Sequence, residues 1–304
     1  MTRRQQPGRD AGDARAVRNG AGHGPRGRTP SFPRPLALAC AFTLIELLVA
    51  IGIIAILVGV LLPALAAARR QAAAIQCGSN VRQLLIASTL YQQENRGFWP
   101  PAHFNYLYPP TKSNLHRWHG TRKSVSSTFD FAGSPLKRYL QAPAIKQCPS
   151  FEPTKLSYEK GCGGYGYNER YIGSSLEVAS LIAVPMGPEQ FEREVSGAPA
   201  KQNMIRRPAE KLAFADAAMV DGSGAMIEYS FVEPPLFTLD GKKESSSPSL
   251  HFRHGRRATI GWADGHVSAE LFEWTYASNA YGANNAKHLL GFFGPRDNHR
   301  FARE

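Results

Sequence analysis

The chain has 304 residues and a hydrophobic content of 43%, enough for one large domain or two small ones with a packed core. Its formal net charge is +12, and residues 1–41 contribute +6 of it, from eight arginines against Asp10 and Asp13. The remaining +6 is an ordinary surface bias with no basic patch interleaved with aromatic residues, so we exclude nucleic acid as a partner.

A long apolar run follows the basic leader. From Phe42 to Leu62 the only polar residues are Thr43 and Glu46, and the apolar and small-residue pattern continues to Ala68. As a helix this segment spans about 32 Å, which is enough to cross the hydrocarbon core of a bilayer. The excess of positive charge predicts a cytoplasmic N-terminus. We therefore expect a single-pass protein of the inner membrane whose body is periplasmic or extracellular.

Three conventional explanations of this run fit it poorly. A secretory signal would be cut near residues 64–68, but the run is longer than an apolar signal region of about 7–15 residues. A lipoprotein signal would be cut before Cys40, which no adequate apolar stretch precedes. An uncleaved anchor fits the length and leaves the cost of Glu46 in the membrane unexplained.

The stretch "AFTLIELLVAIGIIAILVGVLLPALAAARRQA" (41–72) resembles the N-terminus of type IV prepilins and type II secretion pseudopilins. The resemblance implies that a prepilin peptidase/N-methyltransferase cleaves after Ala41 and methylates the new amine of Phe42. It makes Glu46 the fifth residue of the mature chain and Pro63 a helix-kinking proline. The chain departs from the family at Ala41, where glycine is usual.

The resemblance also implies a role for Glu46. Phe42 and Glu46 are four residues apart, so a helix places them on one face. In an assembled filament Glu46 would pair with the Phe42 amine of a neighbouring pilin-like subunit, which offsets the burial of both charges. A carboxylate left unpaired in lipid then favours assembly over dispersed subunits.

Helical character continues beyond the apolar run. Apolar residues recur at three- and four-residue steps from Ile75 to Tyr91, and "GFWPP" (97–101) ends the pattern. We predict one helix from Phe42 to about Asn95, with its first half in the membrane and its second half packed on the body. The predicted organisation is a cleaved leader (1–41), a transmembrane assembly helix (42–68), its soluble half (69–97) and a body (98–304).

The body is rich in Pro, Gly, Ser and aromatic residues, and it predicts short strands rather than helices. Strand-like runs occupy 210–217, 224–233 and 258–271, and in the last of these Asp264-Gly265 is typical of a tight hairpin turn. The fold class is therefore α+β and pilin-like, with the long helix packed on an antiparallel β-sheet.

Other parts of the body predict less regular structure. Segments 111–135 and 239–250 read as loops, with "KKESSSPS" (242–249) as a surface excursion. Segment 175–185 is ambiguous between helix and strand.

A second resemblance covers the body. It rests on "CGSNVRQLLIASTLYQQENRGFWPP" (77–101), "CPS" (148–150), "YGYN" (165–168), "RPAEKLAFAD" (207–216) and "RHGRRATIGWADGHV" (253–267). These stretches are similar to a group of pseudopilin-like proteins with a C-terminal H-X9-DG pattern. His254 and Asp264-Gly265 match that pattern, and the resemblance implies fold and location rather than an activity.

His254, Asp264 and His266 near the hairpin, together with the more distant Asp216, are candidates for a structural or metal-binding role. His254 with Asp264 or His266 suits a transition metal such as zinc, and Asp264 with Asp216 suits calcium if further oxygen ligands join them. The alternative that we favour is structural: His254 bonds Asp264 or a turn amide and fixes the hairpin. We therefore expect no cofactor, with calcium or zinc as the exceptions to test.

The body has no recognisable nucleophile or nucleotide-binding motif, so we expect no enzyme. Cys148 and Cys162 flank a loop rich in glycine and tyrosine, and they are either a disulfide or two separate buried thiols. The function expected first is a subunit of a type II secretion or pilus-like filament. The alternatives are a membrane-anchored binding module that does not polymerise and a metal-dependent enzyme displayed on the same anchor.

Overall fold

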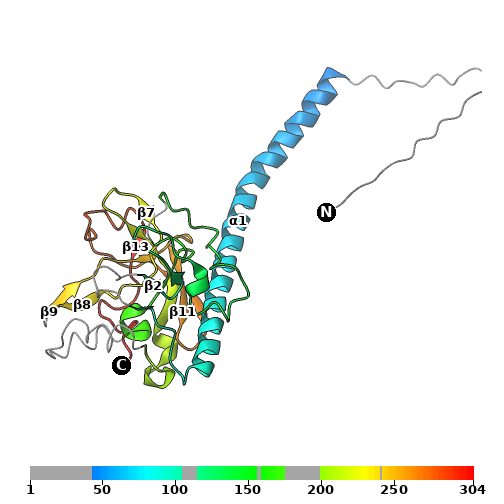
Figure 1. Cartoon of the computed structure of the whole chain (residues 1–304). Helices are drawn as coiled ribbons and strands as arrows, with labels where there is room; N and C mark the ends of the chain where they lie inside the picture. Colours follow the sequence, from blue (N-terminus) through cyan, green and yellow to red (C-terminus); the bar gives the residue numbers. More distant parts are fainter. Residues whose placement is uncertain (1–42, 105–114, 156–158, 175–198, 240–241) are drawn as a thin grey trace, which may run out of the picture. The chain divides into compact units, whose positions relative to one another are not determined.

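The structure is a computed structural model that describes residues 43–104, 115–155, 159–174, 199–239 and 242–304 (Figure 1). Contacts divide the chain into two compact units, residues 1–55 and 56–304. Within the first unit the structure describes residues 43–55, which belong to the long helix α1. The second unit contains the rest of this helix and every strand that the structure describes.

Helix α1 (Leu44–Glu94) has 51 residues and confirms the predicted long helix to within two residues at its start. It begins with a capping box: the Thr43 backbone N–H and hydroxyl both donate to the Glu46 carboxylate at 2.9 Å. The Glu46 backbone N–H lies 3.2 Å from the Thr43 hydroxyl oxygen in return. At the other end, the Gly97 N–H donates to the Gln92 carbonyl at a φ of +80°, a left-handed stop that favours glycine.

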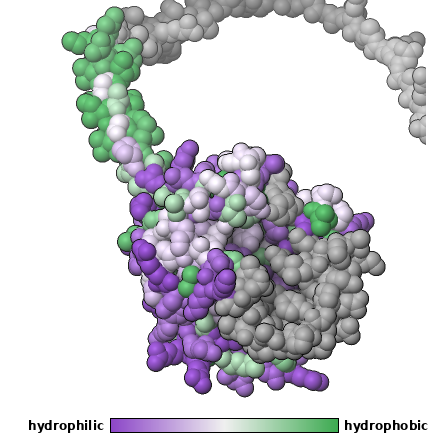
Figure 2. All heavy atoms as spheres, turned by 90° about the vertical axis from the view of Figure 1, so that its left-hand side faces the viewer, coloured by the Kyte–Doolittle hydropathy of each residue, from purple (hydrophilic) through white to green (hydrophobic). Residues whose placement is uncertain are grey.

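The N-terminal half of α1 exposes nearly all of its apolar side chains, and Figure 2 shows this surface. Pro63 lies inside the helix, which continues through it without interruption. A proline has no N–H to donate, so the carbonyl of Gly59 has no helical partner there. This half of the helix is long and apolar enough to span a membrane by length and composition.

The C-terminal half of α1 buries one stripe of side chains at three- and four-residue steps: Cys77, Val81, Leu84, Leu85 and Ser88. The stripe packs on the central sheet, and a glycine permits the close approach. A side chain at Gly261 would bring its Cβ to 2.6 Å from Val81 Cγ1 and 3.0 Å from Leu85 Cδ1. This position requires glycine for space, since its φ is not in the left-handed region.

The central sheet has four antiparallel strands in the order β12-β11-β5-β4. The strands are β4 (Tyr165–Tyr167), β5 (Leu212–Asp216), β11 (Arg257–Trp262) and β12 (Val267–Leu271). Every residue of β5 is buried, as expected for an inner strand covered on both faces. Strands β11 and β12 confirm the predicted hairpin, and Gly265 in its turn has a φ of +97°.

Smaller antiparallel sheets surround this centre. They pair β1 (His103–Phe104) with β2 (His116–Arg117) and β3 (Gly120–Thr121), β6 (Met219–Val220) with β7 (Met226–Ile227), β8 (Leu236–Leu239) with β9 (Lys242–Ser245), and β10 (Leu250–His251) with β13 (Leu290–Gly291). Short helical turns are η1 (Phe131–Gly133), η2 (Glu169–Gly173), η4 (Gln202–Met204) and η5 (Pro208–Glu210).

Three predictions for the body need correction. The polar run after residue 241 is not only a loop, because Lys242–Ser245 forms the exposed strand β9, paired with β8. Segment 111–135 includes strands β2 and β3, and in segment 224–233 regular strand is limited to Met226–Ile227. Segment 175–185 lies outside the described residues.

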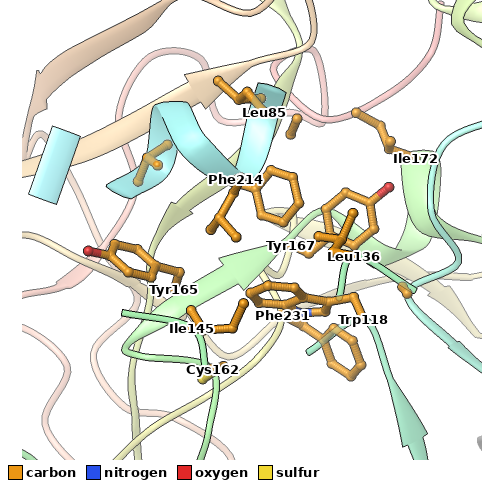
Figure 3. Packing of buried hydrophobic residues seen from close by; sticks show 14 of the residues in the cluster. Leu85, Trp118, Leu136, Ile145, Cys162, Tyr165, Tyr167, Ile172, Phe214 and Phe231 are labelled. Carbon is orange, nitrogen blue, oxygen red and sulfur yellow. The ribbon is translucent and has the colours of Figure 1, made fainter. Parts of the chain in front are cut away.

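Buried hydrophobic residues form two clusters, and the one that includes the second half of α1 is rich in aromatic residues (Figure 3). Tyr167 of β4 stacks on Phe214 of β5 with ring centroids 4.5 Å apart. Trp118 meets Phe214 edge-on at 5.3 Å, and its indole N–H donates to the Ser230 carbonyl at 2.6 Å. The Trp118 indole and the Tyr167 hydroxyl, which donates to the Pro100 carbonyl at 2.9 Å, thus both have partners inside the protein, as is usual for buried aromatics.

Candidate functional site

The first candidate site is the beginning of α1. Ala41 and Phe42 lie outside the described residues, so cleavage between them stays a prediction from the sequence. Glu46 is described, and its carboxylate is held by Thr43 in the capping box. This local contact is a second physical reason for a carboxylate at this position, because negative charge near a helix N-terminus is favourable.

The second candidate site is a buried cluster beneath the soluble half of α1. Asp216 at the end of β5 and His254, just before β11, are two of the residues that the sequence singled out. The structure adds Cys77 from α1 and Cys148 from the segment before β4. One ligand atom from each of these four side chains lies within 4.8 Å of those of the others.

The contacts within the cluster are close. Cys77 Sγ lies 2.7 Å from Cys148 Sγ and 3.1 Å from Asp216 Oδ1. His254 Nε2 lies 3.3 Å from Asp216 Oδ2 and 3.5 Å from Cys148 Sγ. The thiols and the carboxylate are fully buried, and the His254 side chain is 5% exposed.

A shell of polar groups holds these four side chains. The Thr259 N–H donates to Asp216 Oδ2 at 2.7 Å, and Arg253 Nε lies 4.0 Å from Asp216 Oδ1. The hydroxyl of Tyr165 lies 3.3 Å from Cys77 Sγ and accepts a bond from the Asn80 amide at 3.0 Å. The cluster is therefore positioned from both the helix and the sheet.

Charge in the cluster is redistributed by these contacts. Burial opposes ionisation of Asp216, but Arg253 and His254 outweigh it and lower the pKa of this carboxyl to about 2. Burial alone would lower the pKa of His254, but its bonds to Asp216 and Cys148 raise that pKa to about 9. At neutral pH Asp216 is thus a carboxylate and His254 an imidazolium.

The two cysteines differ in their protonation. The hydrogen bond from Cys77 lowers the pKa of Cys148 to about 5 against burial, with help from His254. Burial, together with the Cys148 contact and the Asp216 charge, raises the pKa of Cys77. Without a bound cation, Cys148 is a thiolate and Cys77 a thiol that donates to it.

The structure separates the two halves of the H-X9-DG motif. His254 bonds Asp216 and Cys148 rather than Asp264 or His266, which corrects the expectation that it fixes the hairpin through its turn. Asp264 and His266 pair with each other at 2.6 Å in that turn, on the surface. The spacing of nine residues spans the six-residue strand β11 and the turns at its two ends.

The candidate calcium pair is not brought together either. Asp216 ends β5, whose Ala215 is level with Ile260, whereas Asp264 follows Trp262 at the other end of β11. Cys148 and Cys162 are both free thiols rather than a disulfide, and the neighbouring sulfur of Cys148 is that of Cys77. Cys162 instead lies 3.4 Å from the Glu228 carboxylate.

Sequence reasoning missed Cys77 as a member of this cluster. The signal was present in the helical pattern, because Cys77, Val81, Leu84 and Ser88 lie on the face that enters the core. A cysteine on that stripe, together with Cys148 in the "CPS" stretch, is compatible with a shared site. The sequence has no CxxC spacing that would have indicated it.

No family model, no curated protein and no solved structure matches the chain. The architecture and the two candidate sites are therefore the grounds for a functional proposal.

Proposed function

We propose that the chain is the precursor of a pilin-like or pseudopilin subunit that is cleaved after Ala41, N-methylated at Phe42 and assembled through its N-terminal helix. The observation that carries the proposal is the division of α1. Its first half exposes a continuous apolar surface, and its second half is built into an antiparallel β body. Such a helix requires lipid or other helices around its first half.

Glu46 is the residue on which assembly would depend. The amine of Phe42 in a neighbouring subunit supplies the counter-charge, and it exists only after cleavage. Because the capping box also explains a carboxylate here, a test must keep the cap and remove the charge. Glutamine does so, since either Glu or Gln completes a capping box with Thr43.

Three variants separate these roles: Glu46→Gln, Glu46→Val and Thr43→Val. We expect all three to insert in the membrane, and we expect Glu46→Gln and Glu46→Val to be lost from sheared filaments while Thr43→Val is retained. Incorporation of Glu46→Gln at the wild-type level would contradict the charge-pairing proposal. Retention of Glu46→Gln with loss of both Thr43→Val and Glu46→Val would assign Glu46 to capping alone.

The mature N-terminus tests the processing step. Mass spectrometry of the purified chain should find N-methylphenylalanine at Phe42. A mature chain that starts near Ala67 would indicate a conventional secretory signal and contradict the proposal. An unprocessed Met1 start would contradict it as well.

A second candidate function is a membrane-anchored binding module. The observation in its favour is an open cavity of about 210 Å³ lined by Arg170, Tyr229, Glu233, Phe237 and Tyr281 among others. Photo-crosslinking from positions within 44–62 distinguishes the two functions. Crosslinks between copies of the chain support the filament subunit, and their absence in cells that process the chain supports the binding module.

A further inference from the structure

Four side chains from distant parts of the chain meet beneath α1, and each carries an atom that metals bind. Cys77 comes from the soluble half of α1, Cys148 from the segment before β4, Asp216 from the end of β5 and His254 from the turn before β11. Two thiols, an imidazole and a carboxylate are four ionisable groups within one buried site. Burial of such groups needs compensation.

We propose that Cys77, Cys148, Asp216 and His254 bind one tetrahedral transition-metal ion, best matched by zinc, which fastens the soluble half of α1 to the central sheet. The proposal is independent of filament assembly, because it concerns how the helix is held on the body. It applies equally to a subunit and to an anchored binding module.

The distances from His254 to Cys148 and to Asp216 match the edges of a zinc tetrahedron. With zinc bonds of about 2.3 Å to sulfur and about 2.0–2.1 Å to nitrogen and oxygen, the edges are about 3.8 Å for S···S, 3.5 Å for S···N and 3.3 Å for N···O. The Cys148–His254 distance is 3.5 Å and the His254–Asp216 distance is 3.3 Å.

Two of the three edges at Cys77 are shorter than those of a zinc tetrahedron. Its sulfur lies 2.7 Å from Cys148 Sγ and 3.1 Å from Asp216 Oδ1. An ion at the centre therefore requires the Cys77 sulfur to move outward by about 1 Å toward the S···S edge of a zinc tetrahedron. The contacts of His254 with Cys148 and with Asp216 need little adjustment, since both are already at tetrahedral separations.

The donor set selects among metals. Calcium and magnesium prefer oxygen ligands, and calcium takes six or more of them, so this cluster fits neither. Two thiolates with an imidazole and a carboxylate suit zinc. All four positions of the tetrahedron come from the protein and are buried, which is typical of a structural rather than a catalytic zinc site.

Charge balance favours the same assignment. Binding of the ion releases the protons of Cys77 and His254 to solvent, because ligands of a metal must be deprotonated. Two thiolates, a neutral imidazole, one carboxylate and one divalent cation then leave a single net negative charge. The Arg253 guanidinium lies beside Asp216 and offsets this remaining negative charge. The Arg253 side chain is 3% exposed. Arg253 is held in place by bonds to the carbonyls of Gly164 and Ala217 at 2.9 and 2.7 Å. An outer shell that orients the ligands is expected of a metal site.

The alternative explanation for the close approach of the two sulfurs is a Cys77–Cys148 disulfide. A disulfide would keep the pair of Asp216 with His254 but would remove the Cys148 thiolate that His254 contacts. The metal gives all four side chains a function. The experiment therefore has to distinguish an ion from an S–S bond.

The test uses the full-length chain in detergent micelles with a phosphine reductant, titrated with Co²⁺ alone and then with Zn²⁺. We expect about one equivalent of Co²⁺ to bind with the visible bands of a tetrahedral ion and a near-ultraviolet thiolate band, and Zn²⁺ to displace it. Substitutions Cys148→Ser and His254→Ala should weaken Zn²⁺ binding by more than the about 10–100-fold that outer-shell changes cost. Cys162→Ser is the matched control, because this buried thiol lies outside the cluster, and it should bind like the wild type.

The attachment of α1 has its own readout. Hydrogen exchange of residues 77–92 should slow when Zn²⁺ is loaded and accelerate when a chelator removes it, while exchange in the exposed strand β9 stays unchanged. If the variants do not fold, the wild-type Co²⁺ spectrum decides. Absence of tetrahedral bands, an unaltered spectrum in Cys148→Ser, or a chain that reduction leaves unable to take up metal would each overturn the proposal.

Discussion

The two halves of α1 share one backbone conformation and differ in what surrounds them. Between Leu44 and Leu65 the large apolar side chains are 45–79% exposed, whereas Cys77, Val81, Leu84 and Leu85 are at most 2% exposed. The comparison extends to charge. The carboxylate of the first half, Glu46, is exposed at the helix start, whereas Asp216 and Glu169 of the body are buried. One continuous helix thus has an exposed apolar half and a half that is packed on the body. The two halves differ in the burial of their side chains and not in their helical structure.

The largest expected effect comes from two neighbouring residues of the second half, one buried and one exposed. Leu85→Ala removes a buried side chain between α1 and the sheet and should lower the free energy of unfolding by about 2–5 kcal/mol. Ile86→Ala is the control, because Ile86 is 53% exposed, and it should change stability by less than about 0.5 kcal/mol. Urea unfolding followed by tryptophan fluorescence measures both. Equal losses would contradict the division of the helix into faces.

The second prediction concerns a buried carboxyl group of the body, Glu169, which lies 3.5 Å from His103 Nε2. Burial, with the Glu233 charge, raises the pKa of Glu169 to about 8. Burial and Arg117 lower the pKa of His103 to about 3, so the imidazole is neutral. The folded chain keeps the Glu169 proton where the unfolded chain releases it. Its stabilising contribution is complete below the unfolded pKa of about 4.5 and is lost as the pH rises toward 8.

Glu169→Gln therefore should gain stability relative to the wild type as the pH rises from 5 to 8, by on the order of 3 kcal/mol, since most of the interval between the two pKa values is crossed and each unit of pKa is worth about 1.4 kcal/mol. Urea unfolding of both chains at the two pH values measures the difference. The same substitution at Glu244, on the exposed strand β9, is the control and should show no such trend. A difference that does not grow with pH would show that the folded chain holds Glu169 ionised.

Alanine substitutions at two glycines test how closely the second half of α1 packs on the central sheet. Gly261→Ala places a Cβ 2.6 Å from Val81 Cγ1, so the helix must move away from the sheet, at a cost of about 1–3 kcal/mol. Gly78→Ala meets Val267 Cγ1 at 3.9 Å, an ordinary contact, and should stabilise the helix by about 0.5–1 kcal/mol. Thermal unfolding should therefore shift in opposite directions for the two variants. A shift in the same direction would contradict the packing described at Gly261.

The smallest effect is expected in the hairpin turn, away from the helix. Gly265 has a φ of +97° and open space around its Cα, so Gly265→Ala adds backbone strain without a clash, about 1 kcal/mol. Asp264→Asn is the matched change in the same turn and should cost less, because asparagine can still accept from the His266 N–H. Denaturant midpoints measure both. A larger loss in Asp264→Asn would indicate that the Asp264–His266 pair, rather than the turn, stabilises the hairpin.

The elements with local signals could be predicted. The apolar run and its helical steps predicted α1 to within two residues, and Asp264-Gly265 predicted the hairpin, because both depend on residues close in the chain. The pairing of His254 was not predictable in the same way. Its partner is Asp216, on a strand 38 residues earlier, and not the Asp264 that the motif places nearby.

By itself the sequence determined where the long helix lies, which half is apolar all round, and where the body turns. The tertiary structure decided that Cys77, Cys148, Asp216 and His254 meet, and that Cys148 has Cys77 rather than Cys162 beside it. The physical reason is one of range. Helix periodicity, caps and turns are set within a few residues, whereas a site assembled from four segments depends on the register of β5 against β11 and on the face that α1 turns toward the sheet.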